Sequence, residues 1–161
     1  MIPFSVESLG HDASVMKPIR ADDLLALPVR LHGLQLGRPV ELLLDREEPR
    51  ALGLDLLCGD ETHRFLPLAT ATIGGEALTI ASPLVLLEED ELAFYRDRAV
   101  ALASLRGRTV ERGGRPVGTL RDVVVGEGGA LVEVIVETRA GEQRLPFDER
   151  VRIQPESRSA A

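Results

Sequence analysis

The sequence predicts an all-β protein made of two small β-barrels joined by a short acidic helix. Three observations support this fold. Short apolar segments alternate with Gly, Pro and Asp turns, the pattern recurs in both halves, and one acidic helical segment separates them. Many short strands between such turns are typical of a small barrel or sandwich. With 161 residues, the chain has room for one domain or two small ones.

The first half contains five expected strands. From Val29 onward, apolar and polar residues alternate with a period of two, as on a half-buried strand. Turns rich in Gly, Pro and Asp separate the segments that follow. Before the first strand, Asp22 or Asp23 can begin a short helix that Pro28 ends. The expected strands cover 29–33, 40–44, 51–58, 65–68 and 78–80.

A short helix is expected over 89–97, between the two halves. The acidic run 88–91 places negative charge at a helix start, where the macrodipole favours it. Four apolar residues that follow are spaced for one helical face: Leu92, Tyr95, Ala99 and Leu102. We therefore interpret the acidic run as a helix N-terminus and not as a metal site.

In the second half, apolar and polar residues again alternate as they do in β-strands. Strands are expected over 105–110, 117–125 and 132–136, and the segment 145–153 closes the module. The expected organisation is an N-terminal extension over 1–28, a first module over 29–87, a linker helix over 88–103, a second module over 104–154 and a disordered tail over 155–161.

The two halves share one order of motifs, which indicates an internal repeat. In each half a Gly is followed by an acidic residue and three aliphatic ones, and a later strand carries Leu-Pro. The matching segments are Leu36-Gly37, Glu41 and Leu66-Pro67 in the first half, and Val117-Gly118, Asp122 and Leu145-Pro146 in the second. A module of about 50 residues buries too little surface to be stable alone, so packed modules or a dimer are expected.

The order of motifs in the second half is that of a known family. It contains Leu105-x-Gly107, Gly113, Val117-Gly118-x-Leu120-x-Asp122-Val123, the Gly-rich turn 126–129, Leu145-Pro146 and Val151-x-Ile153. The first half matches through Leu31-x-Gly33, Leu36-Gly37, the segment 42–45, Gly53 and Leu66-Pro67. It departs with Pro39 and Val40 and with a longer path from Pro67 to Ile80. In this joint order the chain resembles a tandem PRC-barrel protein.

The resemblance implies both a fold and a kind of function. PRC-barrel domains are small all-β barrels. Similar domains form the cytoplasmic part of the photosynthetic reaction-centre H subunit and the C-terminal half of a ribosome maturation factor that docks on a ribosomal protein. Neither role is enzymatic, and in both the barrel is a docking platform. The resemblance therefore implies a non-enzymatic protein that binds another protein.

Composition argues against several other functions. The net charge of −7 and an aromatic content of 3% argue against direct nucleic-acid binding, which relies on basic surfaces and stacking aromatics. No apolar run is long enough for a membrane helix, and the N-terminus lacks a secretory signal pattern. Cys58 is the single cysteine, which excludes an intramolecular disulfide and a cysteine-built zinc site. A cytoplasmic location is expected, and peripheral membrane association stays open.

Two arrangements resemble catalytic or metal sites, but each has a simpler interpretation. Cys58 and His63, with Asp60 between them, would form an activated thiolate if they met across a hairpin. We favour a simpler interpretation, in which Cys58 is a small apolar residue at the end of a strand and His63 is a solvated histidine in a turn. The three histidines, His11, His32 and His63, are not at metal-ligand spacing.

Two further patterns also have structural interpretations. Gly126-x-Gly128-Gly129 follows a strand, but no helix follows it, so a hairpin turn is expected and not a phosphate loop. Glu41 and Asp122 occupy equivalent places in the two halves, which favours a role in the fold over paired catalytic carboxylates, with or without Asp45. We therefore expect no catalytic residue, cofactor or metal.

The remaining signal for binding is a cluster of arginines. Between residues 96 and 121 there are seven arginines and only two acidic residues. Guanidinium groups bind carboxylates in bidentate pairs, so this segment is the expected surface for an acidic partner protein. The predicted partner-binding residues are Arg106, Arg108, Arg112, Arg115 and Arg121. Ordinary solvated arginines on strands are the simpler alternative.

The predicted function is a non-enzymatic adaptor that binds another protein. One alternative is a ribosome or RNA maturation factor that docks on a ribosomal protein. Another is a peripheral scaffold of a membrane electron-transfer complex. A homodimer is a further alternative for the oligomeric state.

Overall fold

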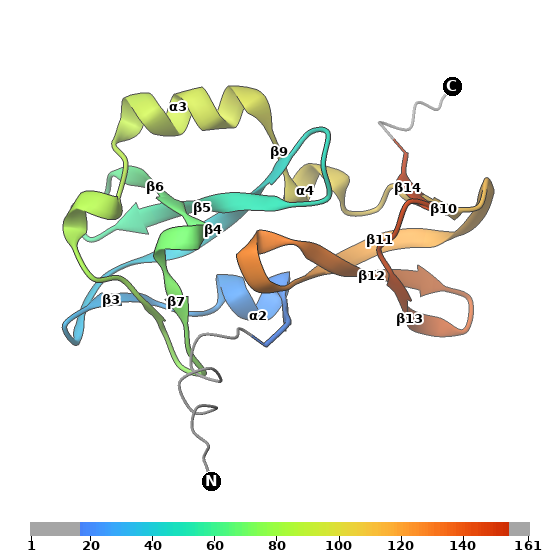
Figure 1. Cartoon of the computed structure of the whole chain (residues 1–161), viewed down its shortest axis with the longest axis horizontal. Helices are drawn as coiled ribbons and strands as arrows, with labels where there is room; N and C mark the ends of the chain where they lie inside the picture. Colours follow the sequence, from blue (N-terminus) through green and yellow to red (C-terminus); the bar gives the residue numbers. More distant parts are fainter. Residues whose placement is uncertain (1–16, 155–161) are drawn as a thin grey trace, which may run out of the picture.

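The structure is a computed structural model that describes residues 17–154 (Figure 1). These residues form two β-sheets, and short helices flank and connect them. Strands account for 52% of the described residues and helices for 20%. The protein is therefore mostly β, as its alternating pattern predicts.

The first sheet has seven strands in the order β6-β5-β4-β3-β8-β7, with β9 paired to the end of β4. All neighbours are antiparallel except β3 and β8, which are parallel. The strands are β3 (Val29–Leu31), β4 (Leu34–Asp45), β5 (Ala51–Cys58), β6 (His63–Pro67), β7 (Thr72–Ile73), β8 (Leu78–Thr79) and β9 (Ala99–Ala101).

The second sheet has six strands in the order β13-β12-β11-β10-β14, with β2 paired to the end of β11. All of its pairs are antiparallel. The strands are β2 (Ile19–Arg20), β10 (Thr109–Arg112), β11 (Arg115–Val125), β12 (Leu131–Thr138), β13 (Gly141–Pro146) and β14 (Val151–Ile153).

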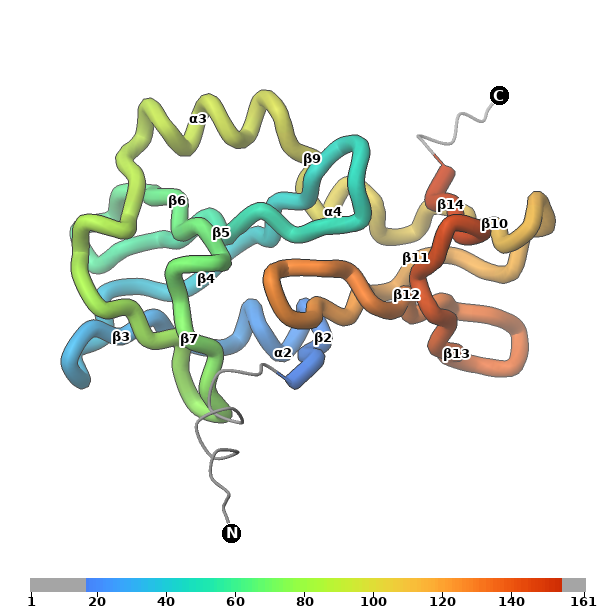
Figure 2. The backbone as a smooth tube through the Cα atoms, in the orientation of Figure 1, coloured from blue at the N-terminus to red at the C-terminus, as the bar shows by residue number. Residues whose placement is uncertain are grey.

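The first strand of each half joins the sheet of the other half. β2 pairs with β11, where Arg20 lies opposite Val124, and β9 pairs with β4, where Val100 lies opposite Leu44. Each of these strands leads directly into a short helix, α2 (Ala21–Leu25) or α4 (Leu102–Leu105). Figure 2 shows blue β2 lying close to the orange second sheet. The two halves therefore complete each other's sheets.

The described strands form two open sheets, where two closed barrels were expected. The first sheet ends at β6 and β7, and the second ends at β13 and β14. The exchange of β2 and β9 offers a physical reason, because each half packs against the other around one shared core. That core combines Leu42 and Leu54 of the first sheet, Val123 and Val134 of the second, and Leu24 of α2.

Several elements lie where the sequence predicts them. β5 covers the expected 51–58, and α2 ends before Pro28. The helix α3 (Glu89–Arg98) matches the expected 89–97. Three short elements, β2, β9 and α4, are not predicted from the sequence, and α4 ends at the residue where a strand was expected to begin. The predicted disordered tail 155–161, like residues 1–16 of the predicted extension, lies outside the described residues.

The acidic run forms the start of α3, as expected. The Glu88 amide donates to the Glu91 carboxylate at 3.0 Å, and both halves of a capping box are present. α3 covers the face of the first sheet that is turned away from the shared core (Figure 1). There Leu92 is buried, and the Phe65 ring stacks on Tyr95 with 4.3 Å between centroids.

The two sheets have the same register at their equivalent positions. Gly37 and Gly118 pair with Val29 and Val110 in the first hairpin of each sheet. An extra residue interrupts the next ladder before Glu41 and before Asp122. Both Leu-Pro pairs also match, because Leu66 lies opposite Leu54 and Leu145 lies opposite Val134. Three single-turn 3₁₀ helices connect the strands: η1 (Leu68–Thr70), η2 (Pro83–Val85) and η3 (Glu127–Gly129).

The matched glycines lie where two strands approach too closely for a side chain. A Cβ added to Gly118 would lie 2.6 Å from the Glu137 carbonyl oxygen, and one added to Gly37 would lie 2.6 Å from that of Leu57. We expect Gly118→Ala or Gly37→Ala to lower the free energy of unfolding by about 1–3 kcal/mol, because the backbone must shift. Urea denaturation measures the loss. Gly75→Ala, where a Cβ meets nothing within 4 Å, is the control, and equal stability of all three variants would contradict the close approach.

Candidate functional site

An apolar groove lies between the two sheets and has a volume of about 790 Å³. It is bounded on one side by β9 and α4 and on the other by β14, which lie near each other in Figure 1. Leu44 and Leu131 line it from β4 and β12, so both sheets contribute. The half-buried apolar side chains in the groove are Val100, Leu105, Phe147 and Ile153.

Acidic side chains form the rim of this groove. They come from the loop between β4 and β5 and from the connection between β13 and β14. The five acidic residues are Asp45, Glu47, Glu48, Asp148 and Glu149, against two arginines, Arg46 and Arg152. The rim therefore carries an excess of negative charge around an apolar centre.

Local hydrogen bonds hold the first acidic loop in place. The Asp45 carboxylate accepts from the Glu47 amide at 2.8 Å and from the Glu48 amide at 3.0 Å. These two bonds lower the pKa of Asp45 and keep it charged. Arg46 donates to the Asp97 carbonyl at 3.3 Å, so its guanidinium is bound to the end of α3. The loop is thus an ordered acidic turn.

The structure divides the five predicted arginines among different surroundings. Arg106 donates to the Asp122 carboxylate at 3.1 Å, and Arg121 lies 3.2 Å from Glu142. Arg108 donates to the Gln154 carbonyl, and Arg112 lies 3.6 Å from Asp148. Arg115 is exposed at the start of β11. The prediction that they bind a partner stays a prediction, and four of them already make contacts within the chain.

Asp122 is the centre of a buried charged cluster. Its side chain has no exposed surface and accepts from Arg20 at 3.2 Å, from Arg106 at 3.1 Å and from the amides of Asp22 and Val123. These contacts attach β2 and α2 to the second sheet. At the equivalent place in the first sheet, the Glu41 carboxylate accepts from the Leu42 amide at 2.9 Å. The expected role of these carboxylates in the fold agrees with this geometry.

Cys58 and His63 do not form the nucleophile–base pair that was considered from the sequence. His63 lies opposite Leu57 in the hairpin, so strand alternation puts Cys58 on the other face of the sheet. His63 Nδ1 lies 2.8 Å from Asp55, whose carboxylate also accepts from Arg96 of α3. Burial raises the pKa of the Cys58 thiol, which favours its neutral form.

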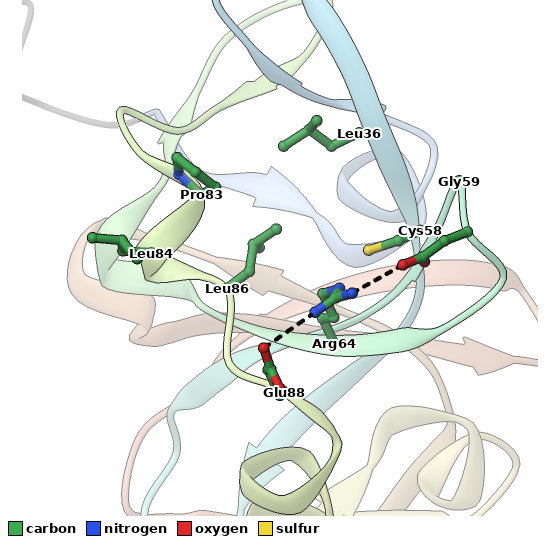
Figure 3. A pocket seen from close by; sticks show the side chains of 9 residues that line it. Leu36, Cys58, Gly59, Arg64, Pro83, Leu84, Leu86 and Glu88 are labelled. Atoms are coloured by element: carbon green, nitrogen blue, oxygen red, sulfur yellow. Dashed lines mark hydrogen bonds and ion pairs between the residues drawn. The ribbon is translucent and has the colours of Figure 1, made fainter.

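A smaller pocket of about 450 Å³ opens beside Cys58 (Figure 3). Arg64 crosses it between Asp60 at 3.0 Å and Glu88 at 3.8 Å. Hydrogen bonds from the Thr62 hydroxyl and amide, and then from Arg64, lower the pKa of the exposed Asp60 to about 2. The polar groups of this pocket therefore already bind one another.

Two further expectations concern loops and metals. The Gly-rich turn 126–129 contains the single-turn η3 and leads directly into β12, a strand and not a helix. Within residues 17–154, no three His, Cys, Asp or Glu side chains are placed to hold a metal ion. His11 lies outside the described residues.

Two comparisons with known proteins identify no relative of this chain. A scan against protein-family models gives no match, and a search of curated proteins finds no similar sequence. None of the helices in the described part of the chain has the length and apolar character to cross a membrane.

Sequence reasoning missed the groove and its rim. The rim residues stand in segments that read only as polar turns, 45–50 and 147–150. The Asp55–His63–Arg96 cluster was missed as well, because Arg96 is distant in sequence and reaches the sheet only through the packing of α3. The acidic residues in both turns were a signal for a charged surface, but no local sequence pattern indicates that the two turns lie on the same groove.

Proposed function

We propose that the protein is a non-enzymatic adaptor that binds another protein through the groove between its sheets. The observation that carries this proposal is the combination of an apolar centre with a charged rim. Protein interfaces have this composition, with an apolar core that excludes water and a polar, solvated border. The half-buried Phe147 and Ile153 supply the apolar contact area.

The arrangement of the other polar groups also supports a binding role. A nucleophile needs a base within hydrogen-bond reach, and Cys58 and His63 lie on opposite faces of their hairpin. Asp55 binds both His63 and Arg96, which links the β5–β6 hairpin to α3. Asp122 is fully buried and holds two elements together. These groups hold elements of the fold together, which supports a binding role over a catalytic one.

We further propose that the halves are tandem PRC-barrel modules that pack together and act in the cytoplasm. The matched register of the two sheets supports a duplication, since the interruptions before Glu41 and before Asp122 recur at equivalent positions. In this proposal the exchange of β2 and β9 opens both barrels and joins them. The free, buried Cys58 suits a reducing compartment.

Affinity capture from the native host, followed by mass spectrometry, tests the proposed function. We expect the unaltered protein to retain a partner in stoichiometric amount and the double variant Glu47→Lys/Glu149→Lys to lose it. The control, Glu76→Lys/Glu137→Lys, changes the net charge equally at exposed positions outside the groove. Capture of no stoichiometric partner, or equal capture by both variants, would contradict the proposal.

A second candidate function is docking on a ribosomal protein, and the acidic rim favours it. Ribosomal proteins are basic because they contact RNA, so an acidic groove complements them. We expect cosedimentation with ribosomal particles that weakens as salt rises. Migration of the protein apart from ribosomal particles at low salt would remove this candidate.

A further inference from the structure

We infer that the groove binds an extended, positively charged segment of the partner, in which apolar side chains alternate with basic ones. This inference rests on the proposed function and specifies the chemistry of the partner. Three observations on the same site carry it: the charge of the rim, the apolar centre and a free strand edge beside them.

The charge of the rim selects a basic occupant. Among the ion pairs of residues 17–154, none involves Glu47, Glu48 or Glu149, so these carboxylates are available to an incoming cation. Arg46 does not neutralise them, since it donates to the Asp97 carbonyl. An acidic peptide or a nucleic-acid backbone would be repelled by this rim.

The centre of the groove selects apolar side chains. Val100 and Leu105 approach from one side, and Phe147 and Ile153 from the other. All four are half-buried, so they retain surface that a partner's side chains can cover. Covering such surface removes apolar area from water and stabilises the complex. A purely basic segment would leave these apolar side chains exposed to water.

A free strand edge favours an extended occupant. The Gln154 amide donates to the Thr109 carbonyl at 2.8 Å, and Ile153 lies opposite Val110 in the antiparallel β10–β14 pair. Hydrogen-bonded and non-hydrogen-bonded pairs alternate along such a ladder, so the Ile153 amide and carbonyl point away from β10. No described strand pairs with that side of β14. Because Ile153 lines the groove, an added strand would place alternate side chains over its apolar centre.

Fluorescence anisotropy with short synthetic peptides tests this inference. The probe is a labelled peptide that alternates lysine and valine. We expect it to bind the unaltered protein and to lose affinity by about tenfold or more with Glu47→Lys/Glu149→Lys, because attraction becomes repulsion. The matched control Glu76→Lys/Glu137→Lys should bind nearly as well as the unaltered protein. An equal loss in both variants would show a nonspecific charge effect and overturn the inference.

Three related peptides separate the contributions to binding. A glutamate–valine peptide should fail to bind because of charge, and a lysine–serine peptide should bind weakly because it lacks apolar side chains. A lysine–valine peptide N-methylated on alternate amides should bind weakly if it pairs with β14. Tight binding of any of these three would overturn the corresponding part of the inference. Circular dichroism of each protein variant verifies that it is folded.

The remaining outcome is that a second copy of the chain occupies the groove. Sedimentation of the protein alone should show a monomer, because two chains of net charge −7 repel each other. A dimer that Glu47→Lys/Glu149→Lys disrupts would overturn the inference. A captured partner that contacts the groove through an acidic segment would overturn the inference but leave the proposed function intact.

Discussion

Asp122→Ala is expected to lower the free energy of unfolding by about 2–4 kcal/mol, because it leaves two backbone amides and two half-buried guanidinium groups without their acceptor. Asp122 has no exposed surface and accepts from Arg20, Arg106 and two backbone amides. Truncation therefore removes the side-chain contacts that, together with the β2–β11 ladder, attach β2 and α2 to the second sheet. Urea denaturation followed by circular dichroism measures the change.

The equivalent carboxylate in the first sheet is the matched control for this variant. Glu41 is half-buried and accepts from the neighbouring Leu42 amide. We expect Glu41→Ala to cost about 1 kcal/mol, the ordinary value of one hydrogen bond. If both variants lost the same stability, the charged cluster at Asp122 would not be the attachment point that its geometry indicates.

Leu24→Ala is expected to destabilise the whole protein by about 2–5 kcal/mol, since it leaves a cavity in the shared core. Leu24 belongs to α2, which precedes the first predicted module, yet its side chain is fully buried against both sheets. The structure therefore predicts one cooperative unfolding transition that shifts as a unit. Thermal denaturation followed separately by near-UV and far-UV circular dichroism measures this shift.

The control for the second prediction is Asp23→Ala on the same helix. Asp23 is exposed, so its loss should change the stability by no more than about 0.5 kcal/mol. A Leu24→Ala variant that keeps its midpoint would contradict the shared core. Two separate transitions in the unaltered protein would contradict it as well, because they would mean that the halves unfold independently.

The exchange of leading strands also explains why the groove exists. β9 and α4 belong to the chain that leads into the second sheet, but β9 is paired in the first. The connection therefore passes along the boundary between the sheets, opposite β14 at the edge of the second sheet. This crossing supplies Val100 and Leu105 to the apolar centre of the groove, whereas the acidic rim comes from the β4–β5 loop and the β13–β14 connection. A docking site at this place would depend on both halves.

Elements with a clear local signal in their own residues could be predicted from the sequence. The segment 51–58 is apolar and bounded by turns, and β5 has these same bounds. The acidic start of the helix at 89–98 could be predicted from charge alone, because the macrodipole acts within a single turn. The correspondence between Leu66-Pro67 and Leu145-Pro146 could also be predicted, because it needs only a comparison of the halves.

The candidate site could be predicted only in part. The opposite faces of Cys58 and His63 follow from pairing register, which places His63 opposite Leu57. The contacts of Arg106 with Asp22 and Asp122 depend on the packing of α2 against the second sheet. The predicted surface of arginines was based on spacing along the chain, and that spacing does not report which charges are neutralised in three dimensions.

By itself, the sequence determined the mostly β composition, the position of β5 and the helix between the halves. The longest strand, β4, begins at Leu34, whereas the sequence predicted a strand only over 40–44. Only the tertiary structure decided which sheet each short strand joins and where the acidic turns meet. The physical reason is the range of the interactions. A strand of eight residues such as β5 carries a continuous apolar signal in its own side chains, whereas β2, with two residues, carries none. Its partner is set by the burial of Leu24 and by the charges around Asp122, which come from distant parts of the chain.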